Sequence, residues 1–356
     1  MSLSAVRRAA VVLCASATLL AACEDENNDP VVPVEEGTIL IDASTATAYR
    51  SFTDDGLVEV TSADSWDMSF RRFTVGLNGG VSGTKGVTAY NLANNADKTP
   101  AEILTYTPEN QQAAFDAIGE SDIPADEAFT SDALAETQTA WFIPTQAGLN
   151  ANPAAAWKLQ RAGAAGHALF RVIEITNAAT PSPTDGMAGI KIEYRLQSPG
   201  GTLGTPDTVD VALASGSSAV IDLGTGTITN GVQPVDCSWD LRVTRAYELL
   251  VNTSATCGVG TFPLRSGEAF ATLTTAADAP SYAPYISTIS GPIPATFDDP
   301  RGPFLYGLND DQVLYPTFNI YLVKVGSAVY KVQLTDYYNS STGASGWPTL
   351  RYARIR

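Results

Sequence analysis

Apolar and polar residues alternate with a period of two through most of this chain. The alternating segments begin at Thr38, Gly189, Thr208, Phe318, Val329 and Thr349. Such alternation is typical of half-buried β-strands, and the 29 glycines and 21 prolines of the chain separate the segments as turns do. The sequence therefore predicts an all-β protein built from antiparallel sheets.

One segment, SWDMSFRRFTVGLNGGVSG from Ser65, loses its alternation partway. Its apolar residues change phase at Arg71 and Arg72. We interpret this change as a β-bulge in one strand, because a bulge would return both apolar sets to the core face. In the related segment CSWDLRVTRAYELLVNTS from Cys237, one more residue is present and the alternation continues. The two strands are therefore predicted to differ in curvature.

The relation between these two segments extends to the whole chain. Segments recur in the same order in both halves, at 65–68 and 238–241, at 157–159 and 320–322, and at 168–172 and 328–332. We predict a tandem duplication whose copies, 38–200 and 205–356, fold as two related domains with separate cores. The alternative is a single domain that carries a long insertion.

The first predicted domain also carries a small helical insert. Residues 97–136 hold ten acidic residues and one lysine, which is the composition of a solvated segment. Within it, Thr107 can cap a helix, Pro108 suits its first turn and Gly119 can end it.

The N-terminus has the pattern of a bacterial lipoprotein signal. Arg7 and Arg8 precede a short apolar run that ends in Leu-Ala-Ala-Cys at Cys23. The run is too short to span a bilayer, so residues 1–22 are predicted to be a cleaved signal peptide, with Cys23 lipidated. Residues 23–37 are acidic and contain prolines, as in an unfolded tether. An ordinary signal peptide is the alternative.

The charge of the chain excludes one class of partner. Removal of residues 1–22, which contain Arg7 and Arg8 and no acidic residue, lowers the formal charge from −17 to −19. A surface with this much negative charge repels the phosphates of nucleic acids. No nucleic acid partner is therefore expected. The lipid on Cys23 is the expected contact with the membrane.

Two cysteines, Cys237 and Cys257, remain in the predicted mature chain. Zinc would need four nitrogen or sulfur ligands, whereas the chain has one histidine. In an oxidising compartment a disulfide between them is the better interpretation. The single histidine also argues against most catalytic triads, and no phosphate-binding loop occurs, so no enzyme is predicted. A carboxylate pair that hydrolyses a glycan is the distant alternative.

Three stretches of the chain resemble the HmuY family of bacterial haem-binding lipoproteins. They are TILIDAS from Thr38, SWDMSFRRFTVGLNGGVSG from Ser65 and IYLVKVGSAVYKVQLTDYYNSSTGASGWPTLRY from Ile320. The resemblance is strong over residues 38 to about 90 and about 315 to 356. It implies an all-β lipoprotein on the surface of the outer membrane that captures haem and passes it to a receptor.

The chain departs from the family pattern at the haem ligands. Family members resemble one another in supplying two axial histidines from loops, but 302–316 and 140–153 contain none. The candidate ligands are His167, expected at a hairpin tip, Met187, expected in a turn, and Met68, expected on the apolar face of a strand. No metal beyond the haem iron is expected.

We therefore expect a non-catalytic surface lipoprotein that binds haem or a related ligand, weakly or through unusual ligands. Its expected partners are this ligand, an outer-membrane receptor and the membrane itself. The alternative is a structural or partner-binding lipoprotein that has kept the fold and lost haem ligation.

The lipidation site gives a direct test. Cys23→Ser should release the protein from membranes into soluble fractions, because the lipid is its expected anchor. Cell fractionation measures the release, with Cys14→Ser in the predicted signal peptide as the matched control. Wild-type membrane retention of the Cys23 variant would contradict the prediction.

Overall fold

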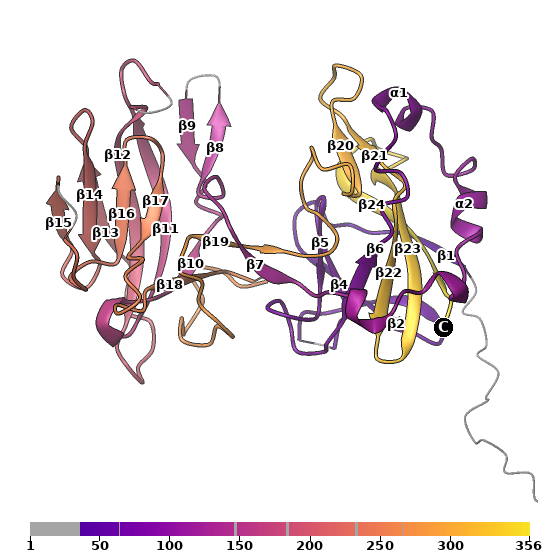
Figure 1. The fold of residues 1–356 in the computed structure, drawn as a ribbon, viewed down its shortest axis with the longest axis horizontal. Helices are drawn as coiled ribbons and strands as arrows, with labels where there is room; N and C mark the ends of the chain where they lie inside the picture. The colour runs from indigo at the N-terminus through magenta and orange to yellow at the C-terminus, as the bar shows by residue number, and fades with distance from the viewer. Residues whose placement is uncertain (1–35, 64, 146–147, 183–184, 232–233, 266) are drawn as a thin grey trace, which may run out of the picture. The chain divides into compact units, whose positions relative to one another are not determined.

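The computed structural model describes residues 36–356 except 64, 146–147, 183–184, 232–233 and 266 (Figure 1). These residues belong to one compact unit, 33–356. The predicted signal peptide, Cys23 and most of the predicted tether lie outside the described residues.

The predicted fold class is confirmed, because the described chain consists mainly of strands and every strand pair in it is antiparallel. Two sheets have five strands. The first contains, in spatial order, β1 (Gly37–Leu40), β24 (Ser345–Arg354), β23 (Ala328–Tyr338), β22 (Ile320–Val325) and β6 (Thr88–Asn91). The second contains β13 (Asp207–Ala212), β12 (Met187–Gln197), β11 (His167–Asn177), β10 (Trp157–Gln160) and β18 (Gly260–Pro263).

Two further sheets have four strands each. The first contains β3 (Gly56–Val60), β2 (Ala48–Thr53), β4 (Met68–Arg71) and β5 (Thr74–Leu77). The second contains β15 (Thr227–Asn230), β14 (Ser218–Asp222), β16 (Leu241–Thr244) and β17 (Leu249–Val251). The remaining pairs are β8 (Phe142–Thr145) with β9 (Gly148–Ala151), β20 (Phe304–Tyr306) with β21 (Leu314–Pro316), and β7 (Ala133–Glu136) with β19 (Ser287–Ser290).

The described strands enclose two main hydrophobic cores. The first core includes Met68, Tyr321 and Leu350, and its strands form what we call the terminal lobe, made of residues 37–132 and 291–356. Figure 1 shows this lobe as a combination of indigo strands from the start of the chain and yellow strands from its end. The second core includes residues from Trp141 to Ile286 and belongs to what we call the middle lobe, residues 137–286.

The strand orders of the two lobes are related by a constant shift in strand number. Raising or lowering each number by twelve converts β1-β24-β23-β22-β6 into β13-β12-β11-β10-β18. The same shift converts β3-β2-β4-β5 into β15-β14-β16-β17, and β8-β9 into β20-β21. The strand sets β1–β12 and β13–β24 therefore follow the predicted repeats 38–200 and 205–356.

Strand pairing crosses the predicted boundary between these repeats. β1 pairs with β24 over Gly37–Leu40, and β12 pairs with β13 over Asp207–Ala212. Separate folding of 38–200 and 205–356 stays a prediction. Two details of the sequence match are corrected. Trp157 lies opposite the last residue of β18, and Tyr321 opposite the last residue of β6, so Trp157 corresponds to Tyr321 and not to Ile320. Trp157 also lies opposite Phe170 as Tyr321 lies opposite Val332, so 168–172 corresponds to 330–334 and not to 328–332.

The predicted β-bulge at Arg71–Arg72 is wrong, because the chain reverses there. β4 and β5 form a hairpin in which Arg71 lies opposite Thr74, and Arg72 has φ 52°. A two-residue turn with positive φ matches the twist of a hairpin, and a reversal changes the apolar phase as a bulge would. The equivalent hairpin β16–β17 has the extra residue in its turn, where Tyr247 has φ 59°.

The Trp-Asp motif that both halves share forms the same hydrogen-bond network in both lobes. In the terminal lobe, Asp67 Oδ2 accepts the N–H of Phe52 at 2.8 Å, and Asn78 donates its amide to the carbonyl of Trp66 at 2.8 Å. The backbone N–H of Asn78 donates to the carbonyl of Asp67 at 2.9 Å. Lys85 Nζ lies 2.6 Å from Asp67 Oδ1 and balances the charge of this buried carboxylate.

In the middle lobe, Asp240 takes the place of Asp67. Its Oδ2 accepts the N–H of Leu223 at 3.1 Å, and Asn252 donates to the carbonyl of Trp239 at 3.2 Å. The backbone N–H of Asn252 donates to the carbonyl of Asp240 at 3.1 Å. Arg161 Nε lies 3.0 Å from Asp240 Oδ2 and balances the charge. Each network joins two hairpins of its four-stranded sheet through one buried carboxylate.

The predicted disulfide is present, since Cys237 and Cys257 are bonded with their Cα atoms 5.1 Å apart. Cys257 is buried, and its carbonyl accepts the N–H of Gly163 at 3.0 Å. The bridge closes a loop that contains β16 and β17, so it fixes the hairpin that holds Asn252.

Helices are short and lie in the predicted acidic insert. α1 (Pro100–Ile103) has a capping box in which the hydroxyl of Thr99 and the carboxylate of Glu102 each accept a backbone N–H. The predicted helix from Pro108 to Gly119 is only partly correct, because α2 spans Gln112–Asp116. The short 3₁₀ turns are η1 (Glu120–Asp122), η2 (Asp126–Ala128) and, in the middle lobe, η3 (Ala162–Ala164).

The two carboxylate networks should contribute similarly to stability. Asp67→Asn and Asp240→Asn should each lower the free energy of unfolding by about 2–4 kcal/mol, because an amide cannot balance Lys85 or Arg161. Urea unfolding measures the loss, with the exposed Asp55→Asn as the control. A loss in one variant and none in the other would show that the networks are not equivalent.

Candidate functional site

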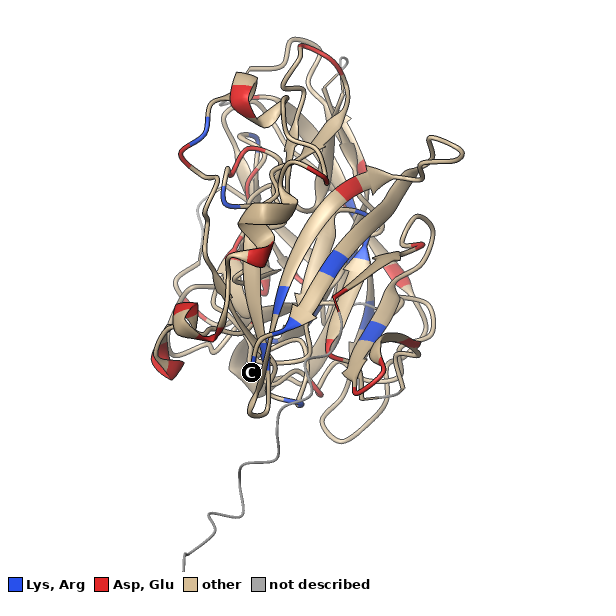
Figure 2. Ribbon diagram, turned by 90° about the vertical axis from the view of Figure 1, so that its right-hand side faces the viewer, with Lys and Arg blue, Asp and Glu red and all other residues tan. Residues whose placement is uncertain are grey.

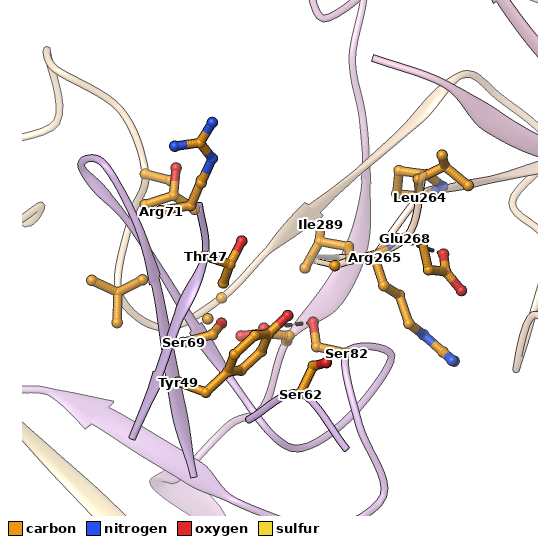
Figure 3. A pocket seen from close by; sticks show the side chains of 18 of the residues that line it. Thr47, Tyr49, Ser62, Ser69, Arg71, Ser82, Leu264, Arg265, Glu268 and Ile289 are labelled. Carbon is orange, nitrogen blue, oxygen red and sulfur yellow. Dashed lines mark hydrogen bonds between the residues drawn. The ribbon is translucent and has the colours of Figure 1, made fainter. Parts of the chain in front are cut away.

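A cavity of about 680 Å³ lies beside the sheet β3-β2-β4-β5 of the terminal lobe (Figure 3). Its walls come from β2, β4 and β5, from the end of β18 and the described residues 264–265 and 267–268 after it, and from β19 and the residues that follow it. Hydroxyl groups are numerous in the lining, among them those of Ser62, Ser69 and Ser82. The volume lies within the range of small-molecule sites in proteins. We call it the polar cavity.

Tyr49 on β2 brings a phenol to the polar cavity. Its side chain is 6% exposed, and its Oη is buried and has no hydrogen-bond partner in the described structure. The ring lies 5.3 Å from the ring of Trp66, which fixes its orientation. Gly267 packs against the phenol so closely that a Cβ at Gly267 would lie 2.7 Å from Tyr49 Oη. A buried hydroxyl without a partner costs free energy, which a bound polar group would offset.

Asp132, immediately before β7, brings a carboxylate to the same cavity. Its Oδ2 accepts hydrogen bonds from the hydroxyl of Ser82 at 2.7 Å and from the N–H of Leu77 at 3.1 Å. Its Oδ1 is buried and has no hydrogen-bond partner in the described structure. Burial raises the pKa of Asp132, and the bonds from Ser82 and Leu77 oppose this rise only in part. Asp132 therefore holds its proton to a higher pH than an exposed aspartate.

Two arginines place positive charge at the edges of the polar cavity. Arg71 donates to the carbonyls of Ala43 and Ser44 at 3.2 and 2.9 Å, which holds its guanidinium in place. Arg265 Nε donates to the carbonyl of Val81 at 3.2 Å. The cavity therefore combines positive groups at its edges with a buried phenol and a buried carboxyl.

A buried lysine fixes the segment that carries Arg265. Lys158 on β10 has a side chain that is 0% exposed, and its Nζ lies 2.6 Å from Glu268 and 2.8 Å from Asp278. Glu268 in turn accepts the backbone N–H of Arg265 at 2.8 Å. This ion-pair network anchors the loop after β18 to the sheet of the middle lobe.

A second, more apolar groove follows the hairpin β8–β9 of the middle lobe. It has a volume of about 420 Å³ and is lined by Phe142, Leu149 and Tyr247, among other residues. The hairpin lies within 140–153, one of the two stretches that lack the histidine typical of the family. The other stretch, 302–316, forms the equivalent hairpin β20–β21. We call this groove the β8–β9 groove.

The structure separates the three predicted haem ligands. His167 is the first residue of β11, is partly exposed, and its ring lies 5.5 Å from that of Tyr282. Burial lowers the pKa of His167. Met68 on β4 is fully buried in the terminal core, as predicted. Met187 does not lie in an exposed turn: it is the first residue of β12 and is fully buried in the middle core.

His167 and Met187 also lie at opposite ends of one hairpin. His167 pairs with Gln197, whereas Met187 pairs with Asn177 at the other end of β11. An eleven-residue strand is about 35 Å long, so both side chains cannot reach one iron atom. Neither His167 nor any methionine lines the polar cavity or the β8–β9 groove. The described residues therefore do not fit haem ligation by histidine or methionine pairs.

The described residues also contain no group of three or more His, Cys, Asp or Glu arranged to hold a metal ion. In the same part of the chain, no helix has the length and apolar character needed to cross a bilayer. The candidate sites are the polar cavity and the β8–β9 groove.

Sequence reasoning did not find the polar cavity. Tyr49 and Asp132 are separated by 83 positions, and neither belongs to a recognised motif. The alternation of AYRSFT indicates a strand around Tyr49, but it does not indicate that the phenol lacks a partner. Only the fold brings the two residues to one cavity.

Comparison with known proteins identifies one family. The sequence model of the family described as "HmuY protein" matches residues 42–352 of this chain. A comparison with curated proteins finds no match.

Among solved structures, the chain is similar to an apo HmuY analogue from Tannerella forsythia, with 8% identity, a TM-score of 0.26, and coverage of 90% of this chain and 95% of that one. It is also similar to a Bacteroides vulgatus protein described as HmuY-like and haem-binding, with 14% identity, a TM-score of 0.15, and coverage of 50% and 96%. A Bacteroides fragilis protein described as a lipoprotein has 13% identity, a TM-score of 0.14, and coverage of 50% and 94%. At these TM-scores the structural similarities support no conclusion.

The raised pKa of Asp132 gives a pH-dependent test of the polar cavity. The folded protein binds this proton more tightly than the unfolded chain, so stability falls as the pH rises from the unfolded to the folded pKa. Asp132→Asn should therefore raise the free energy of unfolding by about 1–2 kcal/mol at pH 7 and by less at pH 4. Urea unfolding at both pH values measures this, with Asp55→Asn as the control. An equal change at both pH values would contradict the prediction.

Proposed function

The chain belongs to the HmuY family, and from this premise we propose that it is a cell-surface lipoprotein that captures haem or a related ligand without catalysis. Its anchor is the lipid on Cys23, and a receptor in the outer membrane takes the ligand from it. The observation that carries the proposal is the family match over residues 42–352, which spans both lobes.

Binding through apolar contact fits the described residues better than axial ligation does. The β8–β9 groove offers Phe142, Leu149 and Tyr247 as apolar and aromatic surface for a flat ring system. No described histidine or methionine lines it. The groove can therefore hold the faces of a porphyrin, and without strong axial bonds the affinity is low.

A haem titration with variants of the β8–β9 hairpin tests this proposal. Leu149→Glu should weaken the binding of ferric haem about tenfold or more, because it removes one apolar side chain from the groove and adds a negative charge there. The Soret band measures binding. Ile143→Glu is the matched control, because Ile143 lies on the same hairpin, is 50% exposed and does not line the groove.

Two outcomes would redirect the proposal. A Soret band identical to that of free haem at every ratio would reject haem capture. A shifted band that His167→Ala abolishes, and Leu149→Glu leaves intact, would show that haem binds at His167 and not in the groove.

The second candidate function is that of a lipoprotein that has kept the fold and lost haem ligation. The polar cavity favours it, because the unpartnered Tyr49 Oη and Asp132 Oδ1 suit a small polar ligand better than a porphyrin. Tyr49→Phe should raise the melting temperature of the free protein and abolish any rise that a small polar ligand causes in the wild type. The exposed Tyr306→Phe should do neither.

A further inference from the structure

Each five-stranded sheet combines strands from both copies of the repeat. β1 and β6 belong to the first copy, but the strands between them, β22–β24, belong to the second. In the middle lobe β13 and β18 belong to the second copy, and β10–β12 between them belong to the first. Each four-stranded sheet, by contrast, comes from a single copy. Both lobes are therefore hybrids with the same internal order.

The strands β7 and β19 lie where the copies cross. They are equivalent under the shift of twelve, and they pair with each other, Ala133 opposite Ser290 and Glu136 opposite Ser287. Antiparallel pairing of two equivalent segments is the local pattern of a twofold axis. The strands of the first copy before β7 lie in the terminal lobe, and those after it lie in the middle lobe. For the second copy the order is reversed: the strands before β19 lie in the middle lobe, and those after it lie in the terminal lobe.

The first irregularity in the long hairpin of each sheet lies at the same place in both copies. β11 breaks register with β12 between Val172 and Glu174, and β23 breaks register with β24 between Leu334 and Asp336. Val172 lies opposite Ile192 as Leu334 lies opposite Leu350, so the two irregularities occupy the same place. The last strands of each copy therefore have the register that allows them to pair between the first strands of the other copy, β22–β24 between β1 and β6 and β10–β12 between β13 and β18.

From this pairing we infer that the protein is an internally strand-exchanged duplicate. Each copy is a complete set of twelve strands, and the two copies have exchanged their last strands at β7 and β19. The surface between β1 and β6 is a docking site for three strands of a second copy, and in this chain that second copy is covalently attached. We call a copy closed if its own last strands, and not those of the other copy, pair with its first strands. Closed copies would form the same kinds of backbone pairs as exchanged copies. The connections at β7 and β19 therefore select the exchanged form.

Cleavage of the full chain between the copies tests the inference. Gly200 and Gly201 lie in an exposed loop between β12 and β13, and a protease recognition sequence inserted between them would allow one cut in the folded protein. The two pieces should co-elute at the size of the intact chain in native buffer and separate in denaturant. Separation in native buffer would overturn the inference, because closed copies would share no sheet.

Paired cysteines give a second, independent measurement. Leu40 on β1 lies opposite Thr349 on β24, and the position equivalent to Thr349 in the first copy is Lys191. Direct cross-strand partners have Cβ atoms close enough for a disulfide. Leu40→Cys with Thr349→Cys should therefore form a bond that keeps the cleaved pieces together in denaturant without reductant.

Leu40→Cys with Lys191→Cys is the matched control. It would form a bond only if the first copy closed on itself, so it should leave two free thiols. All three positions are at least partly exposed, so these substitutions spare the core. A bond in the control pair and none in the first pair would overturn the inference.

Discussion

The central strands of the terminal lobe need hydrogen-bond partners on both sides, and those partners come from the opposite end of the chain. β24 pairs with β1, and β22 pairs with β6 (Figure 1). In the pair of β22 with β6, partner residues are about 230 positions apart in the sequence. Without β1 and β6, the outer edges of β24 and β22 would expose unpaired backbone N–H and C=O groups. The Asp67 network and one wall of the polar cavity belong to the four-stranded sheet β3-β2-β4-β5, whose apolar side chains share one core with those of this five-stranded sheet. Figure 2 shows acidic residues distributed over many elements, in keeping with the negative charge of the chain.

Local patterns predicted much of the secondary structure. Alternation located β12, β13, β22, β23 and β24, because half-buried strands require it. It could not distinguish a bulge from a hairpin at Arg71–Arg72, because both change the apolar phase. The decisive property there is the positive φ of Arg72, which arginine does not indicate in a sequence. Similarly, the prolines before Met187 suggested a turn, whereas Met187 already belongs to a buried strand.

Pairing between distant segments was beyond the reach of these patterns. The sequence predicted two copies, and it also allowed the alternative of a single domain with a long insertion. In the described structure the strand orders repeat under a shift of twelve, and the strands of the terminal lobe come from both ends of the chain. Ile192 on β12 and Leu350 on β24 occupy equivalent places. The apolar pattern of the sequence therefore does not decide whether β12 or β24 pairs with β1. The cavity side chains Tyr49 and Asp132 were missed for the same reason.

The nesting of one lobe inside the other imposes an order of assembly during synthesis. The chain is made from its N-terminus, so the middle lobe has all its strands once Ile286 has been added, whereas the terminal lobe still lacks β20–β24. Until then β1 and β6 have unpaired edges that are open to other chains. Because its contacts span most of the sequence, this lobe is also the slower of the two to form. A nascent molecule is therefore most vulnerable to aggregation through the strands that were made first.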